Sequence, residues 1–199
     1  MEKLSNEKQM EILKAAVDLI SERGFERTTV DEIAARANVG KGTIYLYFEN
    51  KEKIFIAILE NGIQAVIRKL EQILTEPGDF RVRLQTLLTE HLQFADEHRE
   101  FYKVLFKERL NMKLIGDKGA QDRIMEKHKK THQLITQFMQ IGIDQKQLRN
   151  GDPNIYAFAF NGIVSQFCFH WLSEGENGSL VEQVPTILDL FYNGVGKKA

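Results

Sequence analysis

Residues 37–51 have the sequence ANVGKGTIYLYFENK, which predicts a tight turn, a short helix and an immediate restart of the chain at Asn50. A helix this short is not stable by itself in water, so neighbouring elements must hold it in place. At about 100° per residue, Ile44 and Phe48 share one face and can anchor the helix, whereas Leu46 points away from them. The outward face mixes a cation, a hydroxyl, phenols and a glycine, and we expect it to contact a DNA groove.

The segment that precedes this helix carries the signals of a second short helix. Thr29 is followed three residues later by Glu32, which is the spacing of a capping box, and the apolar residues after it repeat at helical spacing. Asn38 can end this helix in the left-handed conformation, and Gly40 can begin the next one where the backbone must come close. The sequence therefore predicts a helix, a short turn and a helix.

These residues resemble a known family. Residues 28–34 (TTVDEIA) and 41–52 (KGTIYLYFENKE) are similar to the amino-terminal domain of TetR-family (TetR/AcrR) transcriptional regulators, and the close match covers roughly the first quarter of the chain. The resemblance implies an all-α homodimer with a three-helix, helix-turn-helix DNA-binding domain at residues 1–49 and an effector-binding and dimerisation domain at residues 50–199. It also implies a repressor that a hydrophobic small molecule releases from palindromic, double-stranded operator DNA.

The resemblance further implies roles for single residues at the DNA. The residues expected to meet the major groove and adjacent phosphates are Lys41, Gly42, Thr43, Tyr45 and Tyr47. Lys51 is expected to bind phosphate, and Thr28 or Thr29 to add a phosphate contact at another helix start. Leu46 either touches a thymine methyl or is simply exposed. Gly40 stands where the family often has a serine, so one phosphate contact is lost.

Composition limits the classes of protein to which the chain can belong. The chain has 199 residues, 43% of them hydrophobic, and a net charge of −1, which argues against a nonspecific polyanion binder. Its single cysteine, Cys168, rules out an intrachain disulfide and suits a reducing compartment. No apolar run reaches the roughly 18–20 residues of a membrane span, and the first residues are polar. We therefore expect a cytoplasmic, almost wholly helical protein.

Helical periodicity and breakers divide the remainder of the chain. We expect helices at about 5–24, 50–74, 79–98, 99–110, 120–145 and 155–172, a loop at 111–118, and a last helix whose start is obscured by Pro185. The helix at 155–172 is apolar nearly all round, which predicts that a partner subunit covers it. The residues expected at the dimer interface are Phe160, Val164, Trp171, Leu188 and Phe191.

Aromatic and methionine side chains after residue 90 are interspersed with polar ones. Two interpretations remain open: a helical core, or an apolar effector cavity with a few directing polar groups. The residues expected to bind the effector, under the second interpretation, are His91, Phe94, Tyr102, Phe106, Arg109, Met125, His128, His132, Phe138, Asn161 and Phe167.

Other chemistries receive little support from the sequence. His128 and His132 have the spacing of a metal pair, but lysines surround them and no third ligand is evident, so we expect no metal and no cofactor. Residues 40–43 lack the Ser or Thr after lysine that a phosphate-binding loop needs. Two alternatives remain: a helical small-molecule binding protein without operator affinity, and a helical enzyme that uses the neighbourhood of His128, His132 or Glu108.

Overall fold

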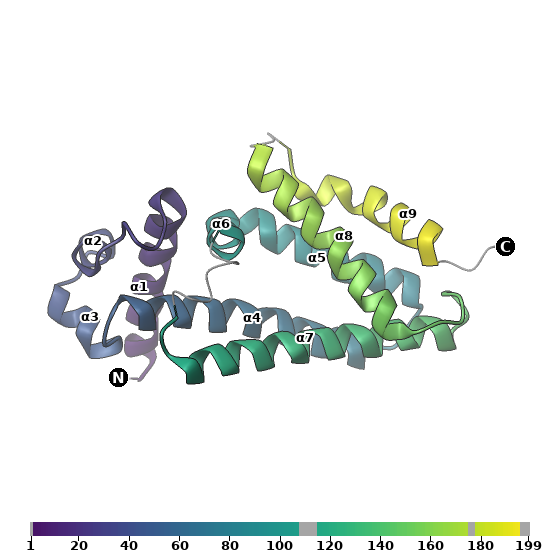
Figure 1. Ribbon diagram of the computed structural model, residues 1–199, viewed down its shortest axis with the longest axis horizontal. Coiled ribbons are helices and arrows are strands. Elements are labelled where there is room, and N and C mark those ends of the chain that lie inside the picture. Colours follow the sequence, from purple (N-terminus) through teal and green to yellow (C-terminus); the bar gives the residue numbers. More distant parts are fainter. Residues whose placement is uncertain (1, 108–114, 175–177, 196–199) are drawn as a thin grey trace. The chain divides into compact units, whose positions relative to one another are not determined.

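The computed structural model describes residues 2–107, 115–174 and 178–195, and the regular elements within these ranges are all helices, which confirms the expected all-α class (Figure 1). The elements are α1 (Glu2–Arg23), α2 (Val30–Arg36), α3 (Lys41–Tyr47), α4 (Lys51–Thr75), α5 (Phe80–Glu97), α6 (Arg99–Lys107), α7 (Lys118–Asp144), α8 (Pro153–Glu174), the 3-10 helix η2 (Leu180–Gln183) and α9 (Val184–Val195).

The helices form two compact units. The first unit contains Met1–Gly62 and Glu100–Met125, and the second contains Ile63–Arg99 and Glu126–Ala199. Both α4 and α7 contribute residues to each unit. The boundary that we expect at residue 49 separates a DNA-binding part from an effector-binding part and does not coincide with these compact units. It stays a prediction.

The core of the first unit is built on the inward stripe of α1. Ile12 and Ile20 have no exposed surface, and α1 ends at Gly24, whose φ of 88° is the left-handed conformation that glycine adopts at a helix end. The ring of Phe25 then packs against that of Phe55 on α4, with centroids 5.0 Å apart. These contacts hold the start of α4 against the helices that precede it.

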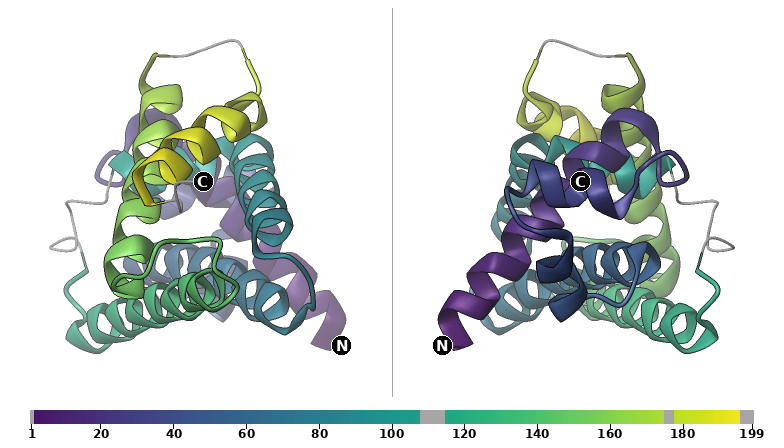
Figure 2. Two further views of the ribbon diagram at one scale, coloured as in Figure 1. Left: turned by 90° about the vertical axis from the view of Figure 1, so that its right-hand side faces the viewer. Right: turned by 90° about the vertical axis from the view of Figure 1, so that its left-hand side faces the viewer.

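The second unit is organised around α5. Asp79 caps its amino terminus by accepting hydrogen bonds from the backbone N–H groups of Arg81 and Val82. Phe80 is fully buried and its ring lies 4.9 Å from that of Phe138 on α7. On the left of Figure 2, the second-unit parts of α4 and α7 lie along the lower side, and α5 and α8 extend upward from them. The helix α9 packs against both α5 and α8.

Several element boundaries follow from local sequence signals. Asn50 accepts a hydrogen bond from the backbone N–H of Lys53, 2.9 Å away, and so caps α4. Pro185 lies in the first turn of α9, where its missing N–H costs no helical hydrogen bond. Most of the loop expected at 111–118 lies outside the described residues, and α7 begins at Lys118.

Candidate functional site

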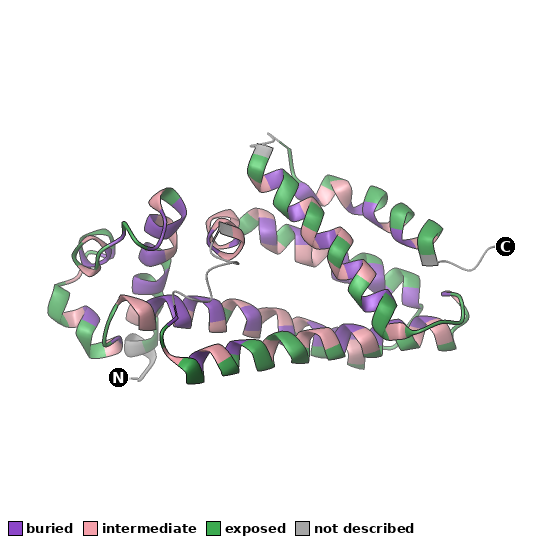
Figure 3. Ribbon diagram, viewed as in Figure 1, coloured by how far each residue is buried: buried purple, intermediate pink, exposed green. Residues whose placement is uncertain are grey.

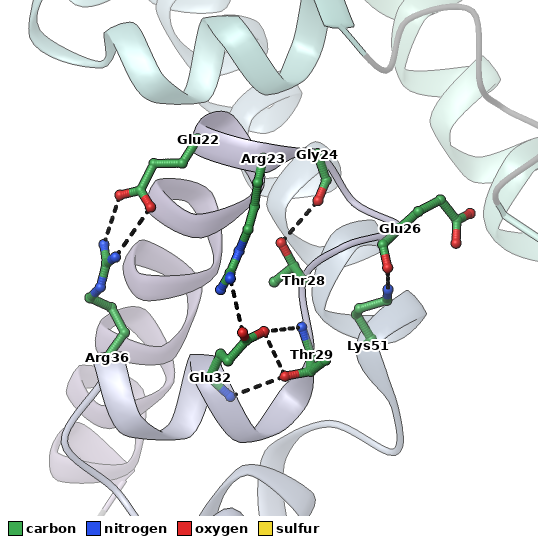
Figure 4. Close-up of polar contacts among 9 residues, drawn as sticks. All are labelled: Glu22, Arg23, Gly24, Glu26, Thr28, Thr29, Glu32, Arg36 and Lys51. Carbon is green, nitrogen blue, oxygen red and sulfur yellow. Dashed lines mark hydrogen bonds and ion pairs between the residues drawn. The ribbon is translucent and has the colours of Figure 1, made fainter.

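The turn between α2 and α3 has the predicted geometry. Thr29 and Glu32 form a full capping box: the Thr29 side chain accepts from the Glu32 N–H at 3.3 Å, and Glu32 accepts from the Thr29 N–H at 2.9 Å (Figure 4). Hydrogen bonds from Thr29 hold the pKa of Glu32 below its ordinary value. Asn38 adopts φ 52°, and the N–H of Val39 donates to the carbonyl of Ala34. The turn is thus fixed by local hydrogen bonds.

The short helix α3 has one buried face and one exposed face. Ile44 has no exposed surface and Phe48 at its end is 5% exposed, whereas Leu46 is 82% and Tyr45 49% exposed. Gly42 is also exposed, and an added Cβ there would meet no atom within 4 Å. A large aliphatic and an aromatic side chain are therefore presented outward from a helix that its neighbours hold in place.

Thr43 and Tyr47 are partly exposed on the flanks of α3, so six of the expected DNA contacts, Lys41 included, lie on one short helix. The sixth, Lys41, is exposed and forms an ion pair with Asp31 on α2, with 2.8 Å between Nζ and Oδ1. This hydrogen bond and charge raise the pKa of Lys41. A phosphate that binds Lys41 would have to compete with the Asp31 carboxylate.

Thr28 needs a correction. It is 1% exposed, and its hydroxyl donates to the carbonyl of Gly24 at 2.9 Å, so it stabilises the end of α1 and cannot reach DNA (Figure 4). Thr29 is exposed, but its hydroxyl already donates to Glu32. The sequence showed two adjacent threonines at a helix start, and only the fold distinguishes the buried one from the cap.

Lys51 also has partners inside its unit. Its Nζ donates to the carbonyls of Phe25, at 2.7 Å, and Glu26, at 3.3 Å, and lies 4.2 Å from the centre of the Phe25 ring. The side chain thereby joins the start of α4 to the segment between α1 and α2 (Figure 4). Its predicted phosphate contact stays a prediction, and the structure gives it a second role in holding the unit together.

A cavity of about 470 Å³ lies within the second unit. Its walls come from α4, α5, α7 and α8, and most of the residues are apolar: Ala65, Val66, Leu70, Leu87, Leu88, Phe94, Ile135, Phe160 and Val164. The polar ones are Lys69, Glu90, His91, Gln93, Glu97, Thr131 and Asn161. This size and this mixture of groups are typical of sites for small organic ligands.

Three of the residues expected to bind an effector, His91, Phe94 and Asn161, line this cavity. Burial lowers the pKa of His91 to about 4, so its imidazole is neutral at pH 7. Sequence reasoning did not select Lys69 or Glu90, which form an ion pair of 2.6 Å. The position of the charged Lys69 between the apolar Val66 and Leu70 on α4 could have indicated that its side chain lies near the apolar interior.

The other residues of that prediction do not line this cavity, and their contact with an effector stays a prediction. Phe138 is fully buried in the core of the second unit, and Phe167 is absent from the walls. His132 is hydrogen-bonded to Asn154, with 2.6 Å between Nε2 and Oδ1, while Met125 and His128 are exposed. Tyr102 and Phe106 belong to the first unit, and Arg109 lies outside the described residues. Helical spacing alone could not distinguish core, cavity and surface for these side chains.

Four of the five residues expected at a dimer interface are buried within the chain itself. Phe160 and Phe191 pack against each other with ring centroids 5.3 Å apart, and Val164 lines the cavity. Trp171 is also buried and donates to the carbonyl of Gly178. Leu188 is partly exposed. The prediction selected the inward side of α8, because an almost uniformly apolar helix does not reveal which side faces the core.

The histidine pair and the cysteine have ordinary surroundings. Across the described ranges, no group of three or more His, Cys, Asp or Glu side chains could hold a metal ion. Cys168 is buried, and burial raises the pKa of its thiol to about 12, so it is not a reactive thiolate. Within the same ranges no helix is both long and apolar enough to cross a membrane.

Comparison with known proteins gives consistent results over nearly the whole chain. Residues 12–58 match the family model for bacterial regulatory proteins of the tetR family, and residues 77–194 match the tetracyclin repressor-like C-terminal domain. The fatty acid metabolism regulator protein of Bacillus subtilis (strain 168) is 24% identical over 200 residues, which cover 96% of this chain and 97% of that protein.

Two solved structures have the same fold. FadR from Bacillus subtilis in complex with stearoyl-CoA superimposes with a TM-score of 0.79 at 24% identity, over 93% of this chain and 98% of that one. The complex of SmeT with triclosan gives a TM-score of 0.78 at 23% identity, over 96% and 93% of the two chains. SmeT is the repressor of the Stenotrophomonas maltophilia multidrug efflux pump SmeDEF.

Proposed function

The chain belongs to the tetR family of bacterial regulatory proteins, and from this premise we propose that it is a homodimeric repressor that a hydrophobic small molecule releases from operator DNA. The exposed face of α3 is the observation that carries the proposal. An exposed Leu46 and Tyr45 on a helix too short to fold alone are poorly suited to water, but they suit the base edges of a major groove.

Residues 1–49 are the proposed DNA-binding domain, and residues 50–199 the proposed effector and dimerisation domain. The helix α4 begins at Lys51, directly after the DNA-binding helices, and continues to Thr75, so it also supplies walls of the cavity. A continuous helix that belongs to both parts is a physical route by which an occupied cavity can influence α3. A regulator of transcription acts where the chromosome lies, so we place the protein in the cytoplasm.

The proposed dimer surface is the outward side of α8 and α9. It carries exposed large apolar side chains, namely Phe158 (73% exposed), Ile155 (57%), Phe169 (46%) and Leu190 (50%). Exposed residues follow the outer sides of these two helices in Figure 3. A two-fold axis through such a surface would bury it against itself and would present two α3 helices to major grooves about 34–36 Å apart, or a multiple of that.

The proposed effector is a hydrophobic or aromatic small molecule in the cavity of the second unit. Support comes from the mostly apolar walls and from two relatives of the same fold, FadR in complex with stearoyl-CoA and SmeT in complex with triclosan. By linkage, an effector that prefers the form with low DNA affinity must weaken DNA binding by the factor by which DNA weakens effector binding.

The test is operator binding by matched variants. DNA fragments selected from a random pool with the purified protein would supply the operator, and fluorescence anisotropy would give its affinity at two salt concentrations. Tyr45→Ala should weaken binding at least about tenfold, whereas Val82→Ala, which removes a side chain that is 64% exposed on α5, should not. Both variants should remain dimers by light scattering. Equal affinity in wild type and Tyr45→Ala, or no specific affinity at all, would refute the proposal.

A further inference from the structure

Most polar groups that line the cavity already have partners. Lys69 and Glu90 form the 2.6 Å ion pair, and Gln93 donates from Nε2 to Oε1 of Glu97 at 2.9 Å. The hydroxyl of Thr131 donates to a backbone carbonyl of its own helix. Because each of these groups already has a charge or hydrogen-bond partner within the protein, a ligand gains little by replacing their contacts.

Asn161 is different. Its side chain lines the cavity from α8, between the wall residues Phe160 and Val164, and it forms no hydrogen bond to any other residue in the ranges that the structure describes. A carboxamide offers two donor hydrogens and an acceptor oxygen. Among apolar walls, such a group gains most from a ligand atom that can hydrogen-bond to it.

The charges around the cavity argue against a charged buried group. Lys69 and Glu90 neutralise each other across their 2.6 Å contact, in which Oε2 of Glu90 is buried. Glu97 is exposed, and it leaves the lining with one more carboxylate than ammonium group. His91 is neutral, because burial lowers its pKa to about 4. A ligand carboxylate buried in the cavity would therefore lack a cation to compensate its charge. A buried ligand ammonium would gain little from Glu97, because water screens the charge of that exposed carboxylate.

We propose, on the basis of the effector site proposed above, that the effector buries an uncharged hydrogen-bonding group against Asn161. The matching chemical class is an apolar molecule that carries an amide, ester or thioester carbonyl. The apolar body lies against walls such as Leu87, Ile135 and Val164, and any charged portion of the molecule stays in solvent. Molecules whose carboxylate or ammonium must enter the cavity are selected against.

The experiment compares four ligands that share one ten-carbon chain and differ at one end. Decanamide, methyl decanoate, decanoate and decylamine are titrated into the full-length protein at pH 7.4 by calorimetry, below their aggregation concentrations. The amide and the ester should bind at least about tenfold more tightly than the two charged compounds. Asn161→Leu should lower decanamide affinity by at least about fivefold and leave an unselective apolar site. Gln85→Leu removes an exposed carboxamide from α5, outside the cavity and away from the proposed dimer surface, and should leave decanamide affinity unchanged.

Three results would overturn the inference: decanoate or decylamine binding as tightly as decanamide, an unchanged ligand preference in Asn161→Leu, or no binding by any member of the series. The thermal midpoint of each variant would show that the fold is retained. Operator affinity of the ligand-free protein is measured separately. The two measurements are independent, so a failure of the ligand inference leaves the DNA-binding proposal intact, and a failure of the DNA-binding proposal leaves the ligand inference intact.

Discussion

The replacement Ile44→Ala tests whether the inward side chain of Ile44 holds α3 in place. Ile44 has no exposed surface, and the change removes three carbon groups at about 0.8 kcal/mol each. The cavity left behind adds to this loss, and fully buried Ile→Ala changes cost 2–5 kcal/mol, so we expect about 3 kcal/mol. For a chain of this size that corresponds to a fall in Tm of roughly 10 °C.

The assay is thermal and urea denaturation followed by circular dichroism, with operator binding measured well below the transition. Leu46→Ala is the matched control, because it lies two residues away on the same helix and is 82% exposed. Its stability should stay within about 0.5 kcal/mol of wild type, while its operator affinity falls if the side chain reaches the groove. Ile44→Ala should lose both stability and affinity. A variant at Ile44 with the wild-type denaturation midpoint would refute the anchoring role.

Glu32→Gln should lower Tm at pH 7, and the difference from wild type should shrink as the pH falls through the lowered folded-state pKa of Glu32, because the carboxyl loses its stabilising contribution as it becomes protonated; a difference that is constant across a pH series of melts would contradict this. Gly42→Ala should leave stability unchanged or raise it by up to about 1 kcal/mol while weakening operator binding. Gly62→Ala should instead lower Tm, because the new Cβ would overlap an aromatic ring of α6. Equal changes of Tm in the two variants would contradict this prediction. Phe158→Glu should give monomers in light scattering and Val82→Glu should not, and a dimeric Phe158→Glu would remove the proposed interface.

The residues expected to contact DNA show how much local sequence signals can predict. The capping box at Thr29, the left-handed Asn38 and the inward Ile44 were all predicted, and the structure confirms them. Each depends on hydrogen bonds or periodicity within a few residues. Thr28 and Lys51 were assigned to DNA alone, yet both bond to carbonyls at the end of α1 or just after it. For Lys51 that carbonyl lies 26 positions away, which no local pattern could indicate.

The sequence by itself determined the helix ends, the turn between α2 and α3 and the family, because caps, breakers and the 3.6-residue period act over short stretches of chain. Only the tertiary structure decided which side of α8 faces inward and which polar side chains meet at the cavity. A helix that is apolar on every side has no periodic signal, and Lys69, Glu90 and Asn161 come together from three helices through packing alone. Those long-range contacts separate the core from the outer face of α8 and leave Asn161 as the polar group available to a ligand.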